Sequence, residues 1–339
     1  MTESVQIKPA SSGFRCTIKL PNYARNDPSL LNDKDFKSLY EATLTYLIIA
    51  NPGQEELSPK KIRPYDEPKK DGLTGYCHGK EFRHEKSVLR KDATCVRNQP
   101  QVQILGQSEF QADEPGNNNG EPISLTHPSH TTFHKEPLAQ EQIIQEKRTR
   151  FYRWHIDSAL HDLSTPMVTS LLGIKMPPVT NTRTIDYDDG SGDVLQLTQA
   201  AFCFVSGAAA FERLSTAEKQ FALNTTLDND GLVMVSEGKE IKFEDLPEWK
   251  ELKVKKLPMP HLQVHGFCFY KLHTKVGSET KTLGLKDVRN KVHSMMRPAI
   301  SPKNQGDLVI FFNRGVLHTN TGEFKGVNNS ADEEVNALV

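Results

Sequence analysis

The sequence has no surplus of charge of either sign. Its 339 residues carry 42 Lys and Arg against 43 Asp and Glu, which gives a formal net charge of -1. Chains that bind nucleic acids or anionic membranes through charge usually carry a positive surplus. We therefore expect neither a nucleic acid nor a membrane among the partners of this chain.

Paired cysteines and long apolar runs are also missing. The five cysteines are scattered, and none belongs to a Cys-x-x-Cys pair of the kind that forms zinc sites or redox dithiols. The longest apolar runs, near residues 46–50 and 308–312, are far shorter than the roughly 20 residues of a membrane-spanning helix. The first twelve residues contain no apolar signal segment. These absences predict a soluble protein of the reducing cytoplasm.

The composition changes along the chain and predicts two parts. Residues 1–95 hold one amphipathic helix, expected over residues 33–50, and an irregular stretch over 52–91 that is rich in Lys, Pro, Gly and Asp. Asn32 or Asp33 is the expected N-cap. The apolar residues of that helix recur at helical spacing, so we expect it to cover a sheet: Phe36, Leu39, Tyr40, Leu44, Leu47 and Ile48.

Residues 96–339 form the second part and consist mostly of short β-like segments separated by turns. Two helices, over 215–223 and 285–296, are expected at the edge of these strands. The sequence therefore predicts a mainly β fold with peripheral helices. The expected strands cover 102–105, 168–174, 194–197, 202–205, 262–269 and 308–312.

A possible metal site begins with His155 and Asp157. If this segment is a strand, residues two apart project from the same face, so the imidazole and the carboxylate could bind one ion. His318 follows the apolar strand at 308–312 and is the candidate third ligand. Two histidines and one carboxylate on one face of an octahedron leave three positions open, as in non-haem Fe(II) oxygenases. A His-x-Asp pair by itself is more often a satisfied polar pair or a turn.

The sequence around these residues resembles a known family. His155, Asp157 and His318, with an Asn-Arg pair at 313–314, match the iron-binding pattern of the TauD-like Fe(II)- and 2-oxoglutarate-dependent dioxygenases. Residues 97–107, 130–135, 151–157 and 204–207 are similar to the fungal 2-oxoglutarate-dependent xanthine dioxygenases, and matching blocks run from about 96 to 324.

The resemblance implies a fold, a cofactor set and a reaction. The fold is a double-stranded β-helix, or jelly roll, with Fe(II) at the three ligands. The reaction is the hydroxylation of xanthine to urate in purine catabolism, in which 2-oxoglutarate and O2 become succinate and CO2. Xanthine is flat and carries many donors and acceptors, so its pocket should contain amide and charged groups with apolar walls. Gln101 and Gln103 are the candidates, and Gln103 is favoured by the resemblance; a polar exposed face of an edge strand explains both glutamines equally well.

The chain departs from the family near its C-terminus. The family holds the distal carboxylate of 2-oxoglutarate with an Arg, because a guanidinium matches a carboxylate in bidentate geometry. Positions 329 and 330 hold Asn and Ser where that Arg would fall, and Lys325 is the only cation after His318. A Thr that also binds 2-oxoglutarate in the family is replaced by Phe202. We expect the core to lack its last strand.

Three functions follow as alternatives. The first is an active xanthine dioxygenase. The second is a catalytically impaired or truncated relative that binds metal without normal turnover, which the missing Arg and Phe202 favour. The third is a TauD-like dioxygenase with another small substrate, because one fold can host many reactions. The oligomeric state is not indicated by the sequence.

Overall fold

A computed structural model describes the fold of this chain. It describes residues 3–11, 15–62, 95–96, 99–112, 121–125, 138–150, 156–157, 167–178, 180–186, 192, 194–199, 201–212, 214–223, 225–229, 255–258, 269–276, 279–283, 299–300, 307–320 and 335–338.

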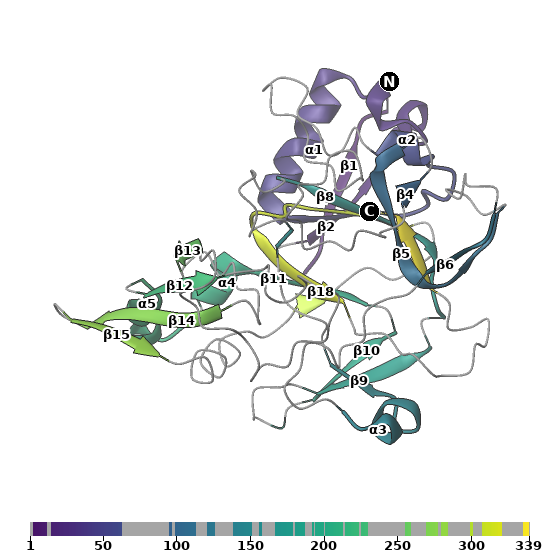
Figure 1. Ribbon diagram of the computed structural model, residues 1–339. Coiled ribbons are helices and arrows are strands. Elements are labelled where there is room, and N and C mark those ends of the chain that lie inside the picture. The colour runs from purple at the N-terminus through teal and green to yellow at the C-terminus, as the bar shows by residue number, and fades with distance from the viewer. Residues whose placement is uncertain are drawn as a thin grey trace.

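Most of the described elements are strands, and the largest sheet joins both ends of the chain (Figure 1). Among the described residues this sheet has nine strands, and β3 (Ile48–Asn51) and β8 (Thr169–Lys175) flank β17 (Leu308–Phe311) in antiparallel register. The N-terminal strands therefore continue the sheet that contains β17. The order is β1 (Gln6–Pro9), β2 (Arg15–Lys19), β3 (Ile48–Asn51), β17 (Leu308–Phe311), β8 (Thr169–Lys175), β19 (Val335–Leu338), β5 (Gln99–Phe110) and β4 (Cys95–Val96), with β6 (Ile123–Leu125) also on β5.

A smaller sheet faces this large one. Its middle strand, β11 (Phe202–Ser206), lies between β16 (Ala299–Ile300) and β18 (Val316–Asn320). Two further sheets are β10 (Val194–Thr198), β9 (Thr182–Asp186) and β7 (Arg148–Thr149), and β13 (Lys255–Pro258), β12 (Thr225–Asn229), β14 (Phe269–Val276) and β15 (Glu279–Leu283). The short helices are η1 (Asn22–Ala24), η2 (Pro28–Leu30), α2 (Pro59–Ile62), α3 (Gln140–Ile144), α4 (Gly207–Glu212) and α5 (Thr216–Leu223).

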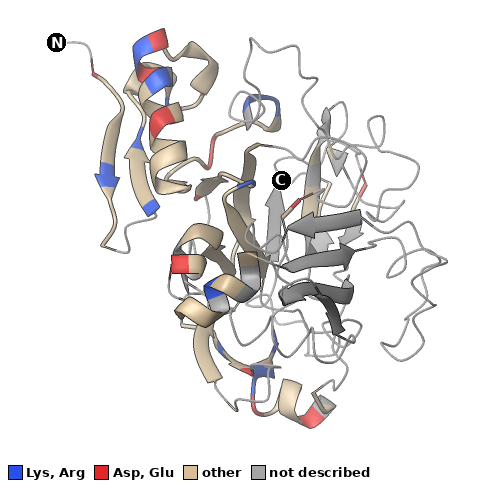
Figure 2. Cartoon of the chain, turned by 90° about the vertical axis from the view of Figure 1, so that its left-hand side faces the viewer, with Lys and Arg blue, Asp and Glu red and all other residues tan. Residues whose placement is uncertain are grey.

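The longest helix, α1 (Asp33–Tyr46), begins where the sequence predicts. The Asn32 side chain caps it by accepting a hydrogen bond from the Asp35 N–H at 2.9 Å. Acidic and basic residues alternate along this helix (Figure 2). The helix packs on β2 and β3, which confirms that it covers a sheet.

The predicted end of this helix at residue 50 is wrong. The helix stops at Tyr46 because Leu47 adopts a left-handed conformation with a φ of 62°, and the chain continues as strand β3. The β-branched Ile48 and Ile49 suit a strand better than a helix. The predicted apolar face is also partly wrong, since Phe36, Tyr40 and Leu44 are each at least 40% exposed.

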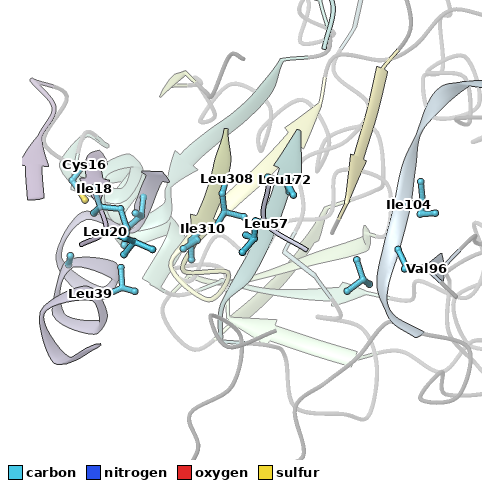
Figure 3. Close-up of a cluster of buried hydrophobic side chains, with 13 residues drawn as sticks. Cys16, Ile18, Leu20, Leu39, Leu57, Val96, Ile104, Leu172, Leu308 and Ile310 are labelled. Carbon is cyan, nitrogen blue, oxygen red and sulfur yellow. The ribbon is translucent and has the colours of Figure 1, made fainter. Parts of the chain in front are cut away.

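Strand β17 is buried on both faces, as its sequence Leu-Val-Ile-Phe predicts for a strand covered on both sides. Leu308 and Ile310 pack on the α1 side with Ile18, Leu39 and Ile49 (Figure 3). Full burial of one such side chain stabilises the fold by about 1.5 to 3 kcal/mol. This cluster therefore packs residues 3–51, called the N-terminal layer below, against β17.

The side chains on the other face of β17 lie between the large sheet and the sheet of β11. There Val309 and Phe311 pack with Ile48, Phe204 and Val316. The side chains of one four-residue strand thus contribute to two separate hydrophobic clusters.

Most of the other elements predicted from the sequence are confirmed, and the rest lie largely outside the described residues. The helix predicted at 215–223 is α5, and the strands predicted at 168–174, 194–197, 202–205 and 308–312 are β8, β10, β11 and β17, each within one residue at either end. The strand predicted at 102–105 is part of the longer β5. The strand at 262–269, apart from Phe269, and the helix at 285–296 lie outside the described residues. The division into 1–95 and 96–339 and the absence of a last strand stay predictions.

Candidate metal centre

His318 is positioned by the β11–β18 pair. It is the middle residue of β18 and lies opposite Phe204 of β11 in the antiparallel register. Its ring centroid is 4.7 Å from that of Phe311 and 6.3 Å from that of Phe204. The residue is only 6% exposed. Two aromatic rings therefore limit the movement of this imidazole.

Asp157 lies in a turn, so the prediction that it belongs to a strand is wrong. Its N–H donates a hydrogen bond to Asn313 Oδ1 at 2.8 Å, and its carbonyl oxygen accepts one from Asn313 Nδ2 at 3.3 Å. One buried amide side chain therefore satisfies both peptide groups that a neighbouring strand would otherwise pair. This explains why Asp157 can be fixed in place without strand pairing.

The carboxylate of Asp157 is oriented by a second residue. Thr169, the first residue of β8, donates a hydrogen bond from its hydroxyl to Asp157 Oδ2 at 2.8 Å. The other oxygen, Oδ1, lies 3.5 Å from His318 Nε2. The structure thus brings two of the three predicted ligands together, and each presents a ligating atom to the other.

The donor set fits a divalent transition metal. An imidazole nitrogen and a carboxylate oxygen each bind such ions at about 2.1 Å, so two donors closer than about 4.2 Å can reach one ion. The 3.5 Å separation of Oδ1 and Nε2 satisfies this condition. His155 lies outside the described residues, which themselves contain no group of three or more His, Cys, Asp and Glu placed to hold a metal.

Sequence reasoning missed Asn313 and Thr169 as site residues. Asn313 belongs to the Asn-Arg pair that carries part of the family resemblance, so a signal for it was present. Thr169 had no signal, because its contact with Asp157 depends on how β8 lies beside the turn. Arg314 of the same pair is exposed.

The predicted substrate and co-substrate residues lie on strands. Gln101 and Gln103 are in β5, where the structure describes their backbone but not their side chains. Phe202 is half-buried at the start of β11, opposite Asn320 of β18, and packs against the cluster that contains Phe204. Lys325, Asn329 and Ser330 lie outside the described residues.

Within the described part of the chain, no helix is both long and apolar enough to cross a bilayer.

The fold is that of the TauD-like dioxygenases, which confirms the predicted mainly β jelly roll. The crystal structure of AAD-2 in complex with Mn(II) and N-oxalylglycine superimposes with a TM-score of 0.56 over 99% of this chain and 96% of that chain, at 10% identity. A putative alpha-ketoglutarate-dependent taurine dioxygenase from Burkholderia xenovorans gives a TM-score of 0.54 over 99% of this chain and 88% of that chain, also at 10% identity. At this identity the likeness concerns the fold alone.

Sequence relatives define the family more narrowly. The alpha-ketoglutarate-dependent xanthine dioxygenase of Emericella nidulans is 36% identical over 325 residues, which cover 87% of this chain and 85% of the relative. The corresponding proteins of Schizosaccharomyces pombe and Neurospora crassa are 32% and 35% identical, over 88% and 87% of this chain and 79% and 77% of each relative. No family model matches the sequence. The chain belongs to the family of fungal alpha-ketoglutarate-dependent xanthine dioxygenases, alpha-ketoglutarate being another name for 2-oxoglutarate.

Proposed function

We propose that this chain hydroxylates xanthine to urate, with Fe(II) held by His155, Asp157 and His318. One oxygen atom of O2 enters the purine at C8 and the other enters succinate, while 2-oxoglutarate loses CO2. The observation that carries the proposal is the 3.5 Å approach of Asp157 Oδ1 to His318 Nε2 in a chain 36% identical to a xanthine dioxygenase over most of its length.

When bound, the iron would supply the redox chemistry that couples oxidative decarboxylation of 2-oxoglutarate to hydroxylation. The residues of the chain hold and orient the reactants. Asn313 and Thr169 fix Asp157, while Phe204 and Phe311 pack around His318. This packing shields the imidazole from water, which strengthens its interactions with charged groups in the site.

The co-substrate and substrate contacts are part of this proposal. Phe202 borders the 2-oxoglutarate site and contributes only apolar contact, since it has no hydroxyl to donate. Gln103 and Gln101 form hydrogen bonds to the edge of xanthine through their amide groups, which can both donate and accept. Their positions on β11 and β5, two strands of the jelly roll, support these roles.

Urate formation is the test of the proposed reaction. Full-length protein supplied with Fe(II), 2-oxoglutarate, O2 and xanthine should release urate and succinate in equal amounts. The variants His318→Ala and Asp157→Ala should lose both products. The variant Asp33→Asn, which changes an exposed carboxylate of α1, should keep them. Urate production no greater than that of His155→Ala would contradict the proposal.

Metal chelation can be tested separately from turnover. Without O2, addition of Fe(II) and 2-oxoglutarate should give a weak visible charge-transfer band, which His318→Ala should abolish. Well-folded protein that never develops this band does not bind the co-substrate at the metal.

A second candidate function is a metal-binding relative with impaired turnover. It is favoured by Asn and Ser at positions 329 and 330, where the family has Arg, and by Phe202 in place of Thr. Under this alternative, Fe(II) binds but neither urate nor succinate accumulates. A panel of other small substrates can then be tested for succinate release. Release with one of them indicates a dioxygenase of different specificity, whereas a relative with impaired turnover releases none.

We also propose that the protein acts in purine breakdown in the cytoplasm. The scattered cysteines support a reducing compartment, and Cys16 and Cys203 carry free thiols. Fractionation of cells that express the tagged chain tests the location. Recovery with membranes or organelles would contradict it.

A further inference from the structure

The two carboxylate oxygens of Asp157 have different neighbours. Oδ2 accepts the hydrogen bond of the Thr169 hydroxyl at 2.8 Å, whereas Oδ1 faces His318 Nε2 at 3.5 Å. A hydroxyl that donates to an ionised oxygen forms a strong, charge-assisted bond and occupies one of the lone pairs of that oxygen. One carboxylate oxygen is therefore bonded to Thr169, and the other faces the predicted metal ligand His318.

Thr169 is itself held firmly. It is the first residue of β8, where it pairs with Phe311 of β17, and it is only 7% exposed. As a β-branched residue it has few side-chain rotamers. Because Phe311 also packs on His318, the hydroxyl donor and the imidazole are positioned by the same part of the sheet.

Asn313 fixes the backbone of Asp157 independently of its carboxylate. It bonds to the N–H and to the carbonyl oxygen of Asp157, and it is fully buried. With the backbone held in this way, the orientation of the carboxylate depends on rotation within the side chain. The hydrogen bond from Thr169 fixes Oδ2 and so favours one orientation of the carboxylate.

We infer that Thr169 is a positioning residue that makes Asp157 bind the metal through Oδ1 alone. The inference rests on the proposed metal centre. A carboxylate that binds through both oxygens occupies two coordination positions. In a six-coordinate site with two histidines it would leave two positions open instead of three. Bidentate 2-oxoglutarate and O2 together need three, so one-oxygen binding keeps the site able to accept both.

The number of water molecules on bound Mn(II) tests this inference without turnover. Nuclear magnetic relaxation of water should report three metal-bound waters in the wild-type protein and two in Thr169→Val, which keeps the shape of threonine but removes the hydroxyl. Affinity of the variant for Mn(II) should fall about 10- to 100-fold, the usual effect of losing a group that orients a metal ligand.

Two variants serve as controls. Thr169→Ser retains the hydroxyl and should restore both the three waters and the affinity for Mn(II). Thr43→Val removes a buried hydroxyl of α1 that donates to the Leu39 carbonyl, and it should behave as wild type. If Thr169→Val does not fold, Thr169→Ala deletes the same hydroxyl with less bulk.

The possible failures can be told apart. Wild-type protein that does not bind Mn(II) would overturn the proposed metal centre, and this inference with it. Wild-type and Thr169→Val proteins that both show three waters and equal affinity for Mn(II) would overturn the role of Thr169 alone.

Discussion

The main-chain carbonyl of Leu47 accepts a hydrogen bond from the N–H of Phe312 at 2.8 Å. Leu47 ends α1 in a left-handed conformation, and Phe312 precedes Asn313, which holds Asp157. The end of the N-terminal helix is therefore attached directly to the turn that leads to His318. Disturbance of this turn should affect both stability and the metal centre.

Gly315 allows this turn to pack closely. A Cβ atom at position 315 would lie 2.7 Å from Phe312 Cδ1 and 3.2 Å from Leu47 Cδ2. We expect Gly315→Ala to lower the free energy of unfolding by about 1 to 3 kcal/mol, as overpacking does. It should also weaken metal binding, because Phe312 is joined to Asn313.

Gly192→Ala is the control for Gly315→Ala, and chemical denaturation measures the unfolding free energy of both variants. Its Cβ would meet no atom within 4 Å, but Gly192 has a φ of +74°. That variant should lose stability through backbone strain alone and keep its metal affinity. Equal metal affinity in wild type and Gly315→Ala would contradict the link between the turn and the site.

The burial of α1 can be tested with two leucines of the same helix. Leu39 is 5% exposed and belongs to the cluster with Leu308 and Ile310, whereas Leu44 is 43% exposed. We expect Leu39→Ala to cost about 2 to 5 kcal/mol of unfolding free energy and Leu44→Ala less than about 1 kcal/mol. Urea denaturation of both variants measures the difference. A larger cost for Leu44→Ala would reverse the assignment of the buried face.

Asp35 connects three parts of the N-terminal layer. Its carboxylate accepts hydrogen bonds from the Val5 N–H, the Tyr23 hydroxyl and the Asn32 amide at 3.1, 3.0 and 2.8 Å. Burial alone raises the pKa of this carboxyl, but the three donors outweigh burial and hold the Asp35 pKa below its usual value. The ionised form is therefore favoured in the folded protein.

The sign of the pH dependence follows from this lowered pKa. The stabilisation is fully present above the unfolded pKa of about 3.9 and is lost as the pH falls through the lower folded value. We expect Asp35→Asn to be less stable than wild type by about 1 to 3 kcal/mol at neutral pH. Denaturation at several pH values should show this gap narrowing below about pH 4. A stability difference between wild type and Asp35→Asn that grows as the pH falls would contradict the lowered pKa of Asp35.

The thiols of Cys16 and Cys203 should be unreactive in the folded protein. Burial raises the pKa of Cys16 to about 11 and that of Cys203 to about 12, and both side chains are fully buried. Because the thiolate is the reactive form, iodoacetamide at about pH 8 should leave both unmodified in native protein and label both in urea. Mass spectrometry of peptides identifies the labelled positions. Rapid native labelling of Cys203 would contradict its burial.

Local patterns predicted much of the strand content and the start of α1. Apolar β-rich runs marked β8, β11 and β17, and Asn32 marked the helix cap. The end of α1 was missed because the helical spacing of apolar residues continues through Leu47 and Ile48. The left-handed turn at Leu47 depends on its contact with Phe312, which lies far away in the sequence.

The site was predicted in part for the same reason. The resemblance named Asp157 and His318, and the structure places them together. It did not indicate that Asp157 lies in a turn, since the bonds from Asn313 that make this possible join distant segments. Thr169 could not be found from local sequence, because a Thr at the start of a strand is common and only the assembled sheet brings it to the carboxylate.

The two-sided burial of β17 has a consequence for protein engineering. Leu308 and Ile310 fit the N-terminal layer, while Val309 and Phe311 fit the side of the roll that holds His318. A chimera that exchanged residues 1–51 for those of a relative would change the partners of Leu308 and Ile310, and through Ile48 also a partner of Val309 and Phe311. The N-terminal layer and β17 should therefore be transplanted as a single cassette, even though about 250 residues of chain separate them.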